Sequence, residues 1–251
     1  MATVAQLDRL CVAFGHHTVL RDVTLALPSR AATVLVGPSG SGKTTLLRSL
    51  NRLNELYPDH RFTGSLHLCL DERTLDVHAP DLDVTFLRRR VAMVFQAPNV
   101  LPVSIRRNLE LPLRLVLGIR GSEAEGRIED AMRQAGLWDE VSHRLGESAT
   151  RLSGGQQQRL CLARSLTLDP AVLLLDEPTA SLDFRAARTI EALILRLKER
   201  YTVVAVSHGL AQAARLADRV VVLDDGRVRE EIGPDGLADP EAFRRHVESL
   251  F

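Results

Sequence analysis

The stretch Gly37-Pro38-Ser39-Gly40-Ser41-Gly42-Lys43-Thr44 matches the pattern G-x-x-x-x-G-K-[ST] at every defined position. An apolar run at residues 33–36 precedes it, and a helix-like segment at residues 43–53 follows. The glycines permit a tight turn whose backbone N–H groups point inward at phosphate oxygens, next to a helix N-terminus. The Lys43 ammonium supplies a cation for the terminal phosphates, and the Thr44 hydroxyl is a ligand for Mg²⁺. The stretch therefore predicts a phosphate site at the end of a buried strand.

Short apolar runs with few or no charges recur along the chain. Besides residues 33–36, they lie at residues 91–95, 172–176, 202–207 and 220–223. Such runs are typical of strands that are buried on both faces of a largely parallel sheet. Helical patterns lie between them at residues 156–167, 186–200 and 210–216. This alternation predicts an α/β fold in which helices cover a mostly parallel sheet.

Two regions depart from the alternation. Residues 10–14 and 23–27 have the period of exposed strands and predict an N-terminal antiparallel β flap. The sequence from Ala97 to about Arg151 is helix-like, most clearly at residues 123–135. Together with the helix that follows, it predicts an inserted helical subdomain at roughly residues 97–165. Near the C-terminus, Asp224-Asp225-Gly226-Arg227 indicates a tight hairpin turn between two strands.

A second polar site follows the run Val172-Leu173-Leu174-Leu175, which ends on Asp176 and Glu177. A buried parallel strand that stops on these residues places them at the carboxyl edge of the sheet, beside the phosphate loop. Asp176 would then hold Mg²⁺ through water, and Glu177 would orient or deprotonate an attacking water. The two motifs together indicate a P-loop NTPase, a class that includes kinases, GTPases, helicases and transport motors.

The stretch Leu152-Ser153-Gly154-Gly155-Gln156 opens the helical pattern at residues 156–167. Ser153 is a favourable N-cap residue, and a helix that begins there presents free N–H groups and a hydroxyl to an anion. The stretch therefore predicts a second phosphate-binding helix end. The simpler alternative is that Ser153 only caps its own helix.

Composition narrows the classes of partner. Lys and Arg together number 32, as do Asp and Glu, so the formal net charge is zero and offers no overall field toward nucleic acid or anionic lipid. Cys11, Cys69 and Cys161 are few and widely spaced, which favours free thiols in a reducing cytosol. No run approaches the ~18 apolar residues of a membrane span, and the N-terminus lacks the pattern of a signal peptide. We expect no nucleic-acid partner, and a membrane role only through another protein.

With these motifs in this order, the sequence resembles the ATP-binding subunits of ABC transporters, whose signature is Leu-Ser-Gly-Gly-Gln. The resemblance covers nearly the whole chain. It implies that Phe14 stacks on adenine, that Gln96 is the glutamine of the Q-loop, that Asp183 belongs to the D-loop, and that His208 is the switch histidine. Taken singly, each of these four residues has an ordinary structural explanation, and only its position relative to the motifs above favours the functional one.

The resemblance also implies the site residues and partners. The catalytic residues would be Glu177, His208, Lys43 and Gln96, and the Mg²⁺ ligands Thr44, Gln96 and Asp176. ATP would be bound by Phe14, by the loop from Gly37 through Thr45, and by Ser153, Gly154, Gly155, Gln156 and Asp183. The signature of one chain would complete the ATP site of a second, giving a head-to-tail homodimer in the ATP-bound state. Membrane-spanning permease subunits, and indirectly a solute-binding protein, would place the chain at the cytoplasmic face of the cell membrane.

Within this family, four stretches resemble the phosphate-importer subunit: residues 51–58, 136–141, 152–164 and 199–204. Departures occur after Gln96, at residues 180–184 and 207–209, and at the C-terminus. The expected function is therefore ATP hydrolysis coupled to solute uptake, with inorganic phosphate as cargo and another oxyanion or small solute as the alternative.

Two further alternatives belong to other functional classes. A non-transport ABC ATPase of DNA repair would carry a long coiled-coil insert, and one of translation would carry two cassettes on one chain. This sequence has neither. A nucleotide-binding scaffold without turnover is disfavoured by the presence of both Glu177 and His208.

Overall fold

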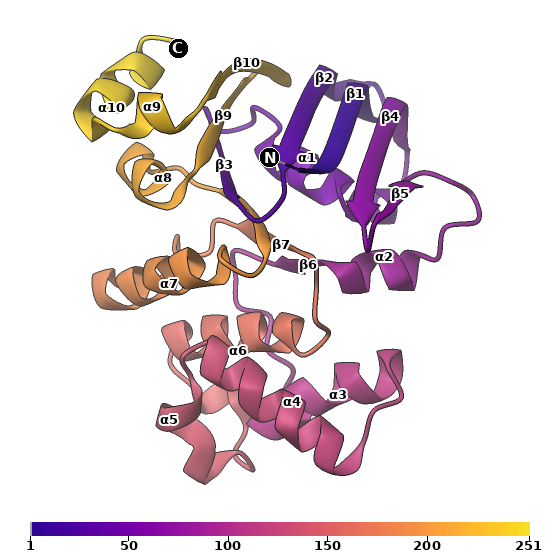
Figure 1. Ribbon diagram of the computed structural model, residues 1–251, viewed down its shortest axis with the longest axis vertical. Coiled ribbons are helices and arrows are strands. Elements are labelled where there is room, and N and C mark those ends of the chain that lie inside the picture. Colours follow the sequence, from indigo (N-terminus) through magenta and orange to yellow (C-terminus); the bar gives the residue numbers. More distant parts are fainter. Residues whose placement is uncertain (1) are drawn as a thin grey trace.

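The centre of the fold is a six-stranded sheet, seen in a computed structural model that describes residues 2–251 (Figure 1). Its strands are β3 (Ala32–Val36), β6 (Val91–Val94), β7 (Val172–Asp176), β8 (Thr202–Val206), β9 (Arg219–Asp224) and β10 (Arg227–Ile232). They lie in the order β10-β9-β3-β8-β7-β6, and all neighbours are parallel except β9 and β10. Every residue of β3, β7 and β8 is buried, as expected for strands covered on both faces.

A four-stranded antiparallel sheet packs beside it (Figure 1). Its strands are β1 (Thr3–Phe14), β2 (His17–Pro28), β4 (His60–Leu70) and β5 (Arg73–Asp76), in the order β2-β1-β4-β5. The predicted flap is thereby confirmed, although its strands are longer than the segments expected from the sequence. β4 and β5 are additions that the sequence analysis did not foresee.

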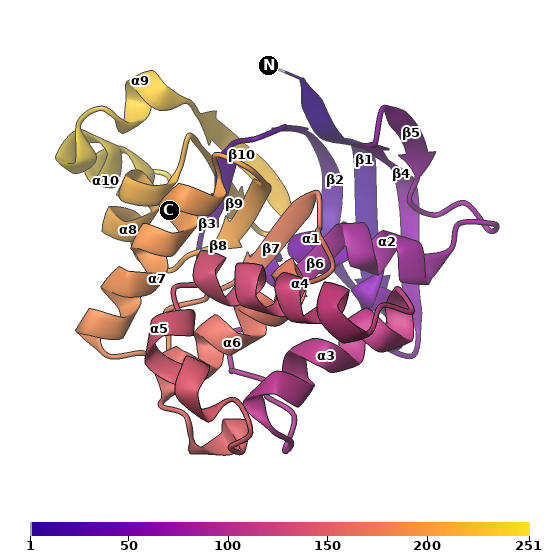
Figure 2. The ribbon, with the colours of Figure 1, turned by 60° about the horizontal axis from the view of Figure 1, so that its bottom comes forward.

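Helices cover both sides of the large sheet. They are α1 (Lys43–Ser49), α2 (Val84–Arg90), α3 (Ile105–Val116), α4 (Gly121–Gln134), α5 (Trp138–Val141), α6 (Gly154–Leu166), α7 (Phe184–Leu197), α8 (Leu210–Leu216), α9 (Pro234–Leu237) and α10 (Pro240–Glu248). Short 3₁₀ turns occupy Leu53–Leu56, Ser142–Arg144 and Ala149–Arg151. The helices α3 to α6 lie between β6 and β7 in sequence and gather into one layer in both views, which confirms the helical insertion (Figures 1 and 2). Among residues 2–251, no helix combines the length and the apolar character that crossing a membrane requires.

Two boundaries illustrate how local chemistry sets the elements. The helix expected at residues 43–53 ends at Ser49, because Arg52 adopts a left-handed conformation with φ of 58° and a 3₁₀ turn follows. The predicted hairpin between β9 and β10 is confirmed, and its turn residues Asp225 and Gly226 have φ of 43° and 73°. Positive φ at both central positions is the requirement of the tight hairpin turn that matches strand twist.

The hydrophobic residues form two cores, one on each face of the large sheet. In β3, Val34 and Val36 face the helical side, whereas Leu35 faces the core shared with the antiparallel sheet and α1. The register sets Leu35 of β3 opposite Val206 of β8, and Val206 opposite Asp176 of β7. The segments that follow these three strands therefore emerge together at one edge of the sheet.

Candidate functional site

A cavity of about 470 Å³ opens at this edge of the sheet. Its lining residues are His17, Val19, Ser39, Gly40, Gly42, Lys43, Thr44, Thr45, Glu177 and His208. Eight of the ten belong to the set expected from the sequence; His17 and Val19, from the start of β2, do not. The loop after β3, Glu177 after β7 and His208 after β8 thus share one cavity.

The loop depends on glycine where the backbone is most confined. Gly37 has φ of 146°, and a Cβ there would lie 1.9 Å from the carbonyl oxygen of Leu223. Gly42 has φ of 99°, and its Cβ would lie 2.7 Å from Cδ2 of Leu20. Both the conformation and the space exclude a side chain, so the motif's glycines are steric requirements of this loop.

Lys43 occupies the middle of the loop. Its Nζ donates hydrogen bonds to the carbonyl oxygens of Gly37 (2.8 Å) and Pro38 (2.7 Å). Burial lowers the pKa of Lys43, and the nearby charges of Glu177 and Asp176 counteract part of that effect. A cation held by neutral carbonyls beside two carboxylates can transfer its hydrogen bonds to phosphate oxygens at little steric cost.

Thr44 and Asp176 form a polar pair between α1 and β7. The Thr44 hydroxyl donates to Oδ1 of Asp176 at 2.8 Å, and the Arg48 guanidinium lies 3.8 Å from Oδ2. Burial raises the pKa of Asp176, while the hydrogen bond from Thr44 and the charge of Arg48 oppose the rise. Arg48, in the last turn of α1, is a member of this site that the motif pattern does not identify.

This pair fits a magnesium ion. Mg²⁺ prefers hard oxygen ligands and is held in nucleotide sites by one or two side chains, with phosphate and water completing the shell. A hydroxyl and a carboxylate in hydrogen-bond contact supply two such oxygens. Among residues 2–251, no group of three or more His, Cys, Asp or Glu side chains is placed to hold a metal by itself.

Glu177 and His208 meet across the cavity. Oε1 of Glu177 lies 2.6 Å from Nε2 of His208. Glu177 has a positive φ of 46°, a conformation that non-glycine residues adopt rarely, and its side chain is largely buried. A carboxylate fixed by an imidazole at the mouth of a phosphate loop can orient a water molecule and accept its proton.

Phe14 and Gln96 lie outside the lining of this cavity. Phe14 packs edge-on against Tyr57, with ring centroids 5.6 Å apart, and lies 5.7 Å from the ring of His60. Gln96 is exposed just after β6, and the carbonyl of the preceding Phe95 accepts a hydrogen bond from Gln158 of α6. That bond joins the end of β6 to the helical layer.

The segment 153–156 begins α6 and lies apart from the cavity lining. Ser153 caps the helix in a capping box with Gln156, in which Oγ accepts the Gln156 N–H at 3.3 Å. The cap uses Oγ only as an acceptor, so its O–H proton stays available to an anion. Asp183 caps α7 in the same way, accepting the N–H of Ala186 at 2.9 Å. Gly155 packs so closely on Ala186 that a Cβ would lie 2.8 Å from the Ala186 methyl.

Comparisons with known proteins point to one family. Residues 20–180 match the family model described as ABC transporter. The phosphate import ATP-binding protein PstB 2 of Aliivibrio fischeri is 45% identical over 229 residues, 91% of this chain and 82% of that protein. The phosphate import ATP-binding protein PstB of Thermotoga maritima is 42% identical over 231 residues, 92% of this chain and 90% of that protein.

Solved structures agree. The dimeric post-hydrolysis state of the ATP-binding cassette MJ0796, bound to ADP and Pi, has a TM-score of 0.74 and 30% identity, covering 91% of this chain and 98% of that one. CbiO1 from Clostridium perfringens has a TM-score of 0.81 at 22% identity, covering 98% and 94%, a likeness of fold. The resemblance drawn from the motifs is confirmed over most of the chain.

Proposed function

The chain belongs to the ABC transporter family of ATP-binding ATPases, and on that premise we propose that it is the ATP-hydrolysing subunit of an importer of inorganic phosphate. Two curated relatives named as phosphate import proteins, 45% and 42% identical over more than nine-tenths of this chain, support the cargo. The alternative cargo is another oxyanion or small solute. The ATPase chemistry is the same in either case.

The cavity residues support specific roles in hydrolysis. Lys43 and the backbone N–H groups of the loop bind the β and γ phosphates, and Thr44 and Asp176 hold Mg²⁺. When bound, Mg²⁺ neutralises phosphate charge that develops during transfer. Glu177 accepts the proton of the attacking water at a carboxylate oxygen, and His208 keeps that carboxylate oriented.

Three further residues have proposed roles outside the cavity lining. Phe14 stacks on adenine after leaving its contact with Tyr57. Gln96 contributes to the Mg²⁺ shell and transmits the state of the nucleotide to α6, a role supported by the bond between Phe95 and Gln158. Asp183 contacts the nucleotide site of a second chain from the start of α7.

A second copy of the chain is needed to complete the site. Ser153, Gly154, Gly155 and Gln156 begin α6 but do not line the cavity that holds Lys43. Near them, Phe184 at the start of α7 leaves 74% of its surface exposed. We propose a head-to-tail homodimer in the ATP-bound state, in which each signature segment donates to the γ phosphate held by the other chain.

The remaining proposals concern organisation and partners. Residues 1–251 form one ATP-binding domain, with a helical subdomain at roughly 97–165 that receives a membrane-spanning permease. The chain then lies at the cytoplasmic face of the cell membrane, and a solute-binding protein acts on the same permease from the other side.

The observation that carries the proposal is the convergence of Lys43, Thr44, Asp176, Glu177 and His208 at one edge of the sheet. The test is uptake of labelled phosphate by cells whose only high-affinity phosphate transporter contains this chain. Uptake of labelled sulfate is the control. Loss of phosphate uptake alone in a Glu177→Gln strain supports the cargo, because the protein is present and only hydrolysis is blocked. Unchanged phosphate uptake in that strain contradicts it.

A further inference from the structure

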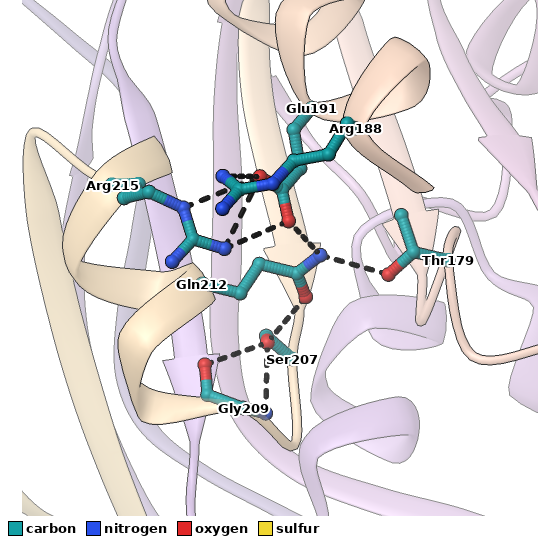
Figure 3. Close-up of polar contacts among 7 residues, drawn as sticks. All are labelled: Thr179, Arg188, Glu191, Ser207, Gly209, Gln212 and Arg215. Atoms are coloured by element: carbon teal, nitrogen blue, oxygen red, sulfur yellow. Dashed lines mark hydrogen bonds and ion pairs between the residues drawn. The ribbon is translucent and has the colours of Figure 1, made fainter. Parts of the chain in front are cut away.

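The side-chain amide of Gln212, on α8, joins the loop after β7, helix α7 and the segment after β8 (Figure 3). Its Nε2 donates to Oγ1 of Thr179 at 2.8 Å and to Oε1 of Glu191 at 3.1 Å. Its Oε1 accepts from the hydroxyl of Ser207 at 2.7 Å. Thr179 lies in the loop after β7, Glu191 lies on α7, and Ser207 directly follows β8.

The chemistry of the partners fixes the orientation of this amide. Glu191 is 8% exposed, and Arg215 donates to both of its carboxylate oxygens at 3.0 and 3.2 Å. Burial by itself raises the pKa of Glu191, but hydrogen bonds from Arg215 and Gln212 and the charges of Arg215 and Arg188 outweigh it and lower the pKa. An ionised carboxylate only accepts hydrogen bonds. The NH₂ group of Gln212 must therefore face Glu191, and its carbonyl must face Ser207.

The bonded residues adjoin the two groups that meet in the cavity. Ser207 immediately precedes His208, and its Oγ also accepts the N–H of Gly209 at 3.1 Å. Ser207 therefore restrains the backbone on both sides of the histidine. Thr179 lies two residues after Glu177. Gln212 therefore connects, by hydrogen bonds to Thr179 and Ser207, the two segments that carry Glu177 and His208.

We propose that Gln212 is a positioning residue that sets His208 against Glu177 and links both to the loop 179–183. The inference rests on the proposed function, because it assigns the amide to the hydrolytic step. Since Asp183 ends the same loop and caps α7, a second chain that contacts this loop would also adjust the contact between His208 and Glu177.

The experiment measures steady-state ATP hydrolysis and equilibrium ATP binding by the full chain carrying Gln212→Met, which keeps length and removes all three hydrogen bonds. We expect hydrolysis to fall by about tenfold to a hundredfold, because a displacement of a reacting group by about 1 Å can cost ~10²-fold in rate. The dissociation constant for ATP should stay within about twofold, because Gln212 does not line the cavity. Gln134→Met is the matched control: Gln134 bridges Tyr201 and Asp130 by similar bonds elsewhere and should leave both quantities unchanged.

A rescue separates positioning from general packing. Gln212→Glu places a second carboxylate against Glu191 and should reduce ATP hydrolysis as strongly as Gln212→Met does. Adding Glu191→Gln exchanges amide and carboxylate, so that Ser207 and Thr179 can both donate to position 212, and at least half of the lost rate should return.

Several outcomes would overturn the inference. The inference is wrong if Gln212→Met hydrolyses ATP at the wild-type rate, or if Gln134→Met loses as much of the rate. It is also wrong if the double variant Gln212→Glu, Glu191→Gln recovers none of the lost rate. If Gln212→Met does not fold, Thr179→Val removes one bond of the path without changing shape and must reduce hydrolysis with ATP binding intact. If Glu177→Gln hydrolyses ATP normally, the proposed function fails instead; if Glu177→Gln is inactive while the Gln212 variants are normal, only this inference fails.

Discussion

Oε1 of Glu177 and Nε2 of His208 lie 2.6 Å apart, although the two residues are separated by α7 and β8 in the sequence. The contact exists within one chain because β7 and β8 are parallel neighbours whose carboxyl ends meet at the same edge. A proton acceptor and its orienting partner are therefore built into the monomer, while the signature segment that begins with Ser153 lies apart from the cavity. In the proposed function, each chain supplies the proton acceptor and its orienting partner, and the signature segment of a second chain completes the site.

Lys43→Ala should weaken ATP binding by about tenfold to a hundredfold, the size of a lost charge-assisted hydrogen bond, and should reduce hydrolysis below detection. The reason is that Lys43 is the cation of the loop and is already aligned by the carbonyls of Gly37 and Pro38. Fluorescent-nucleotide titration measures the binding. Lys198→Ala is the control. Lys198 is the only other lysine of the chain and pairs with Asp218, so its replacement should leave ATP binding unchanged. Equal binding by both variants would contradict the loop assignment.

Asp176→Asn should raise the melting temperature of the nucleotide-free protein at about pH 8. Burial raises the pKa of Asp176, so the folded chain binds this proton more readily than the unfolded chain. The contribution of Asp176 to stability is therefore fully present below its unfolded pKa and is lost as the pH rises from there through the raised folded pKa, and asparagine removes this loss. Each kcal/mol is worth about 2–4 °C at this chain length.

The gain from Asp176→Asn should shrink at a lower pH, below the raised pKa of Asp176, where the wild-type carboxyl takes up its proton. Scanning calorimetry at both pH values measures it. Asp225→Asn, at an exposed turn position that tolerates asparagine, should show no such pH-dependent gain. A lower melting temperature for Asp176→Asn at the higher pH would contradict the explanation.

The sequence was sufficient for the elements whose pattern is local. Uninterrupted apolar runs predicted the buried strands, and the positions of the phosphate loop and of Asp176 and Glu177 at the ends of two of them predicted the shared edge, whereas His208 was implied by the family resemblance. β4 was not predicted because its first residues are mostly exposed and show no apolar pattern. It forms by pairing with β1, which is distant in the sequence. Propensity is a weak guide to such strands.

Contacts between side chains of different helices and strands also could not be predicted from the sequence. Arg48 beside Asp176 and Gln212 between Thr179 and Glu191 depend on how α1, α7 and α8 dock on the sheet. No spacing in the sequence encodes these contacts. The contact of Phe14 with Tyr57 depends likewise on the pairing of β1 with β4.

Gly155→Ala should destabilise the protein by about 1–3 kcal/mol, because the new methyl would overlap that of Ala186 at 2.8 Å. Thermal unfolding measures the loss, which should be largely reversed by adding Ala186→Gly. Gly154→Ala is the matched control: its methyl would meet Leu182 at 3.7 Å, an ordinary contact. Equal stability of the Gly154→Ala and Gly155→Ala variants would mean that α6 and α7 are not packed as described.

Ser153→Arg should bind ATP as the wild type does but should not hydrolyse it, because the arginine side chain obstructs the approach of a second chain. Mixed with Lys43→Ala, it should recover at most one working site, formed by Lys43 of one chain and Ser153 of the other. ATPase assays of the separate and mixed proteins measure this. Ser104→Arg, which removes the corresponding N-cap of α3, controls for the lost cap and should retain activity. Full activity of the Ser153→Arg protein by itself would mean that the signature segment is only a helix cap.

The head-to-tail dimer that ATP closes and hydrolysis opens is the central claim, and Glu177→Gln tests it most directly. The amide keeps the shape of Glu177 but cannot accept a proton from water, so hydrolysis should fall by ~10²-fold or more while ATP remains bound. With saturating ATP and Mg²⁺, size-exclusion chromatography with light scattering should then give twice the mass of the 27.7 kDa chain, whereas the wild type with ADP stays largely monomeric. A Glu177→Gln protein that binds ATP and remains at the monomer mass would contradict the account.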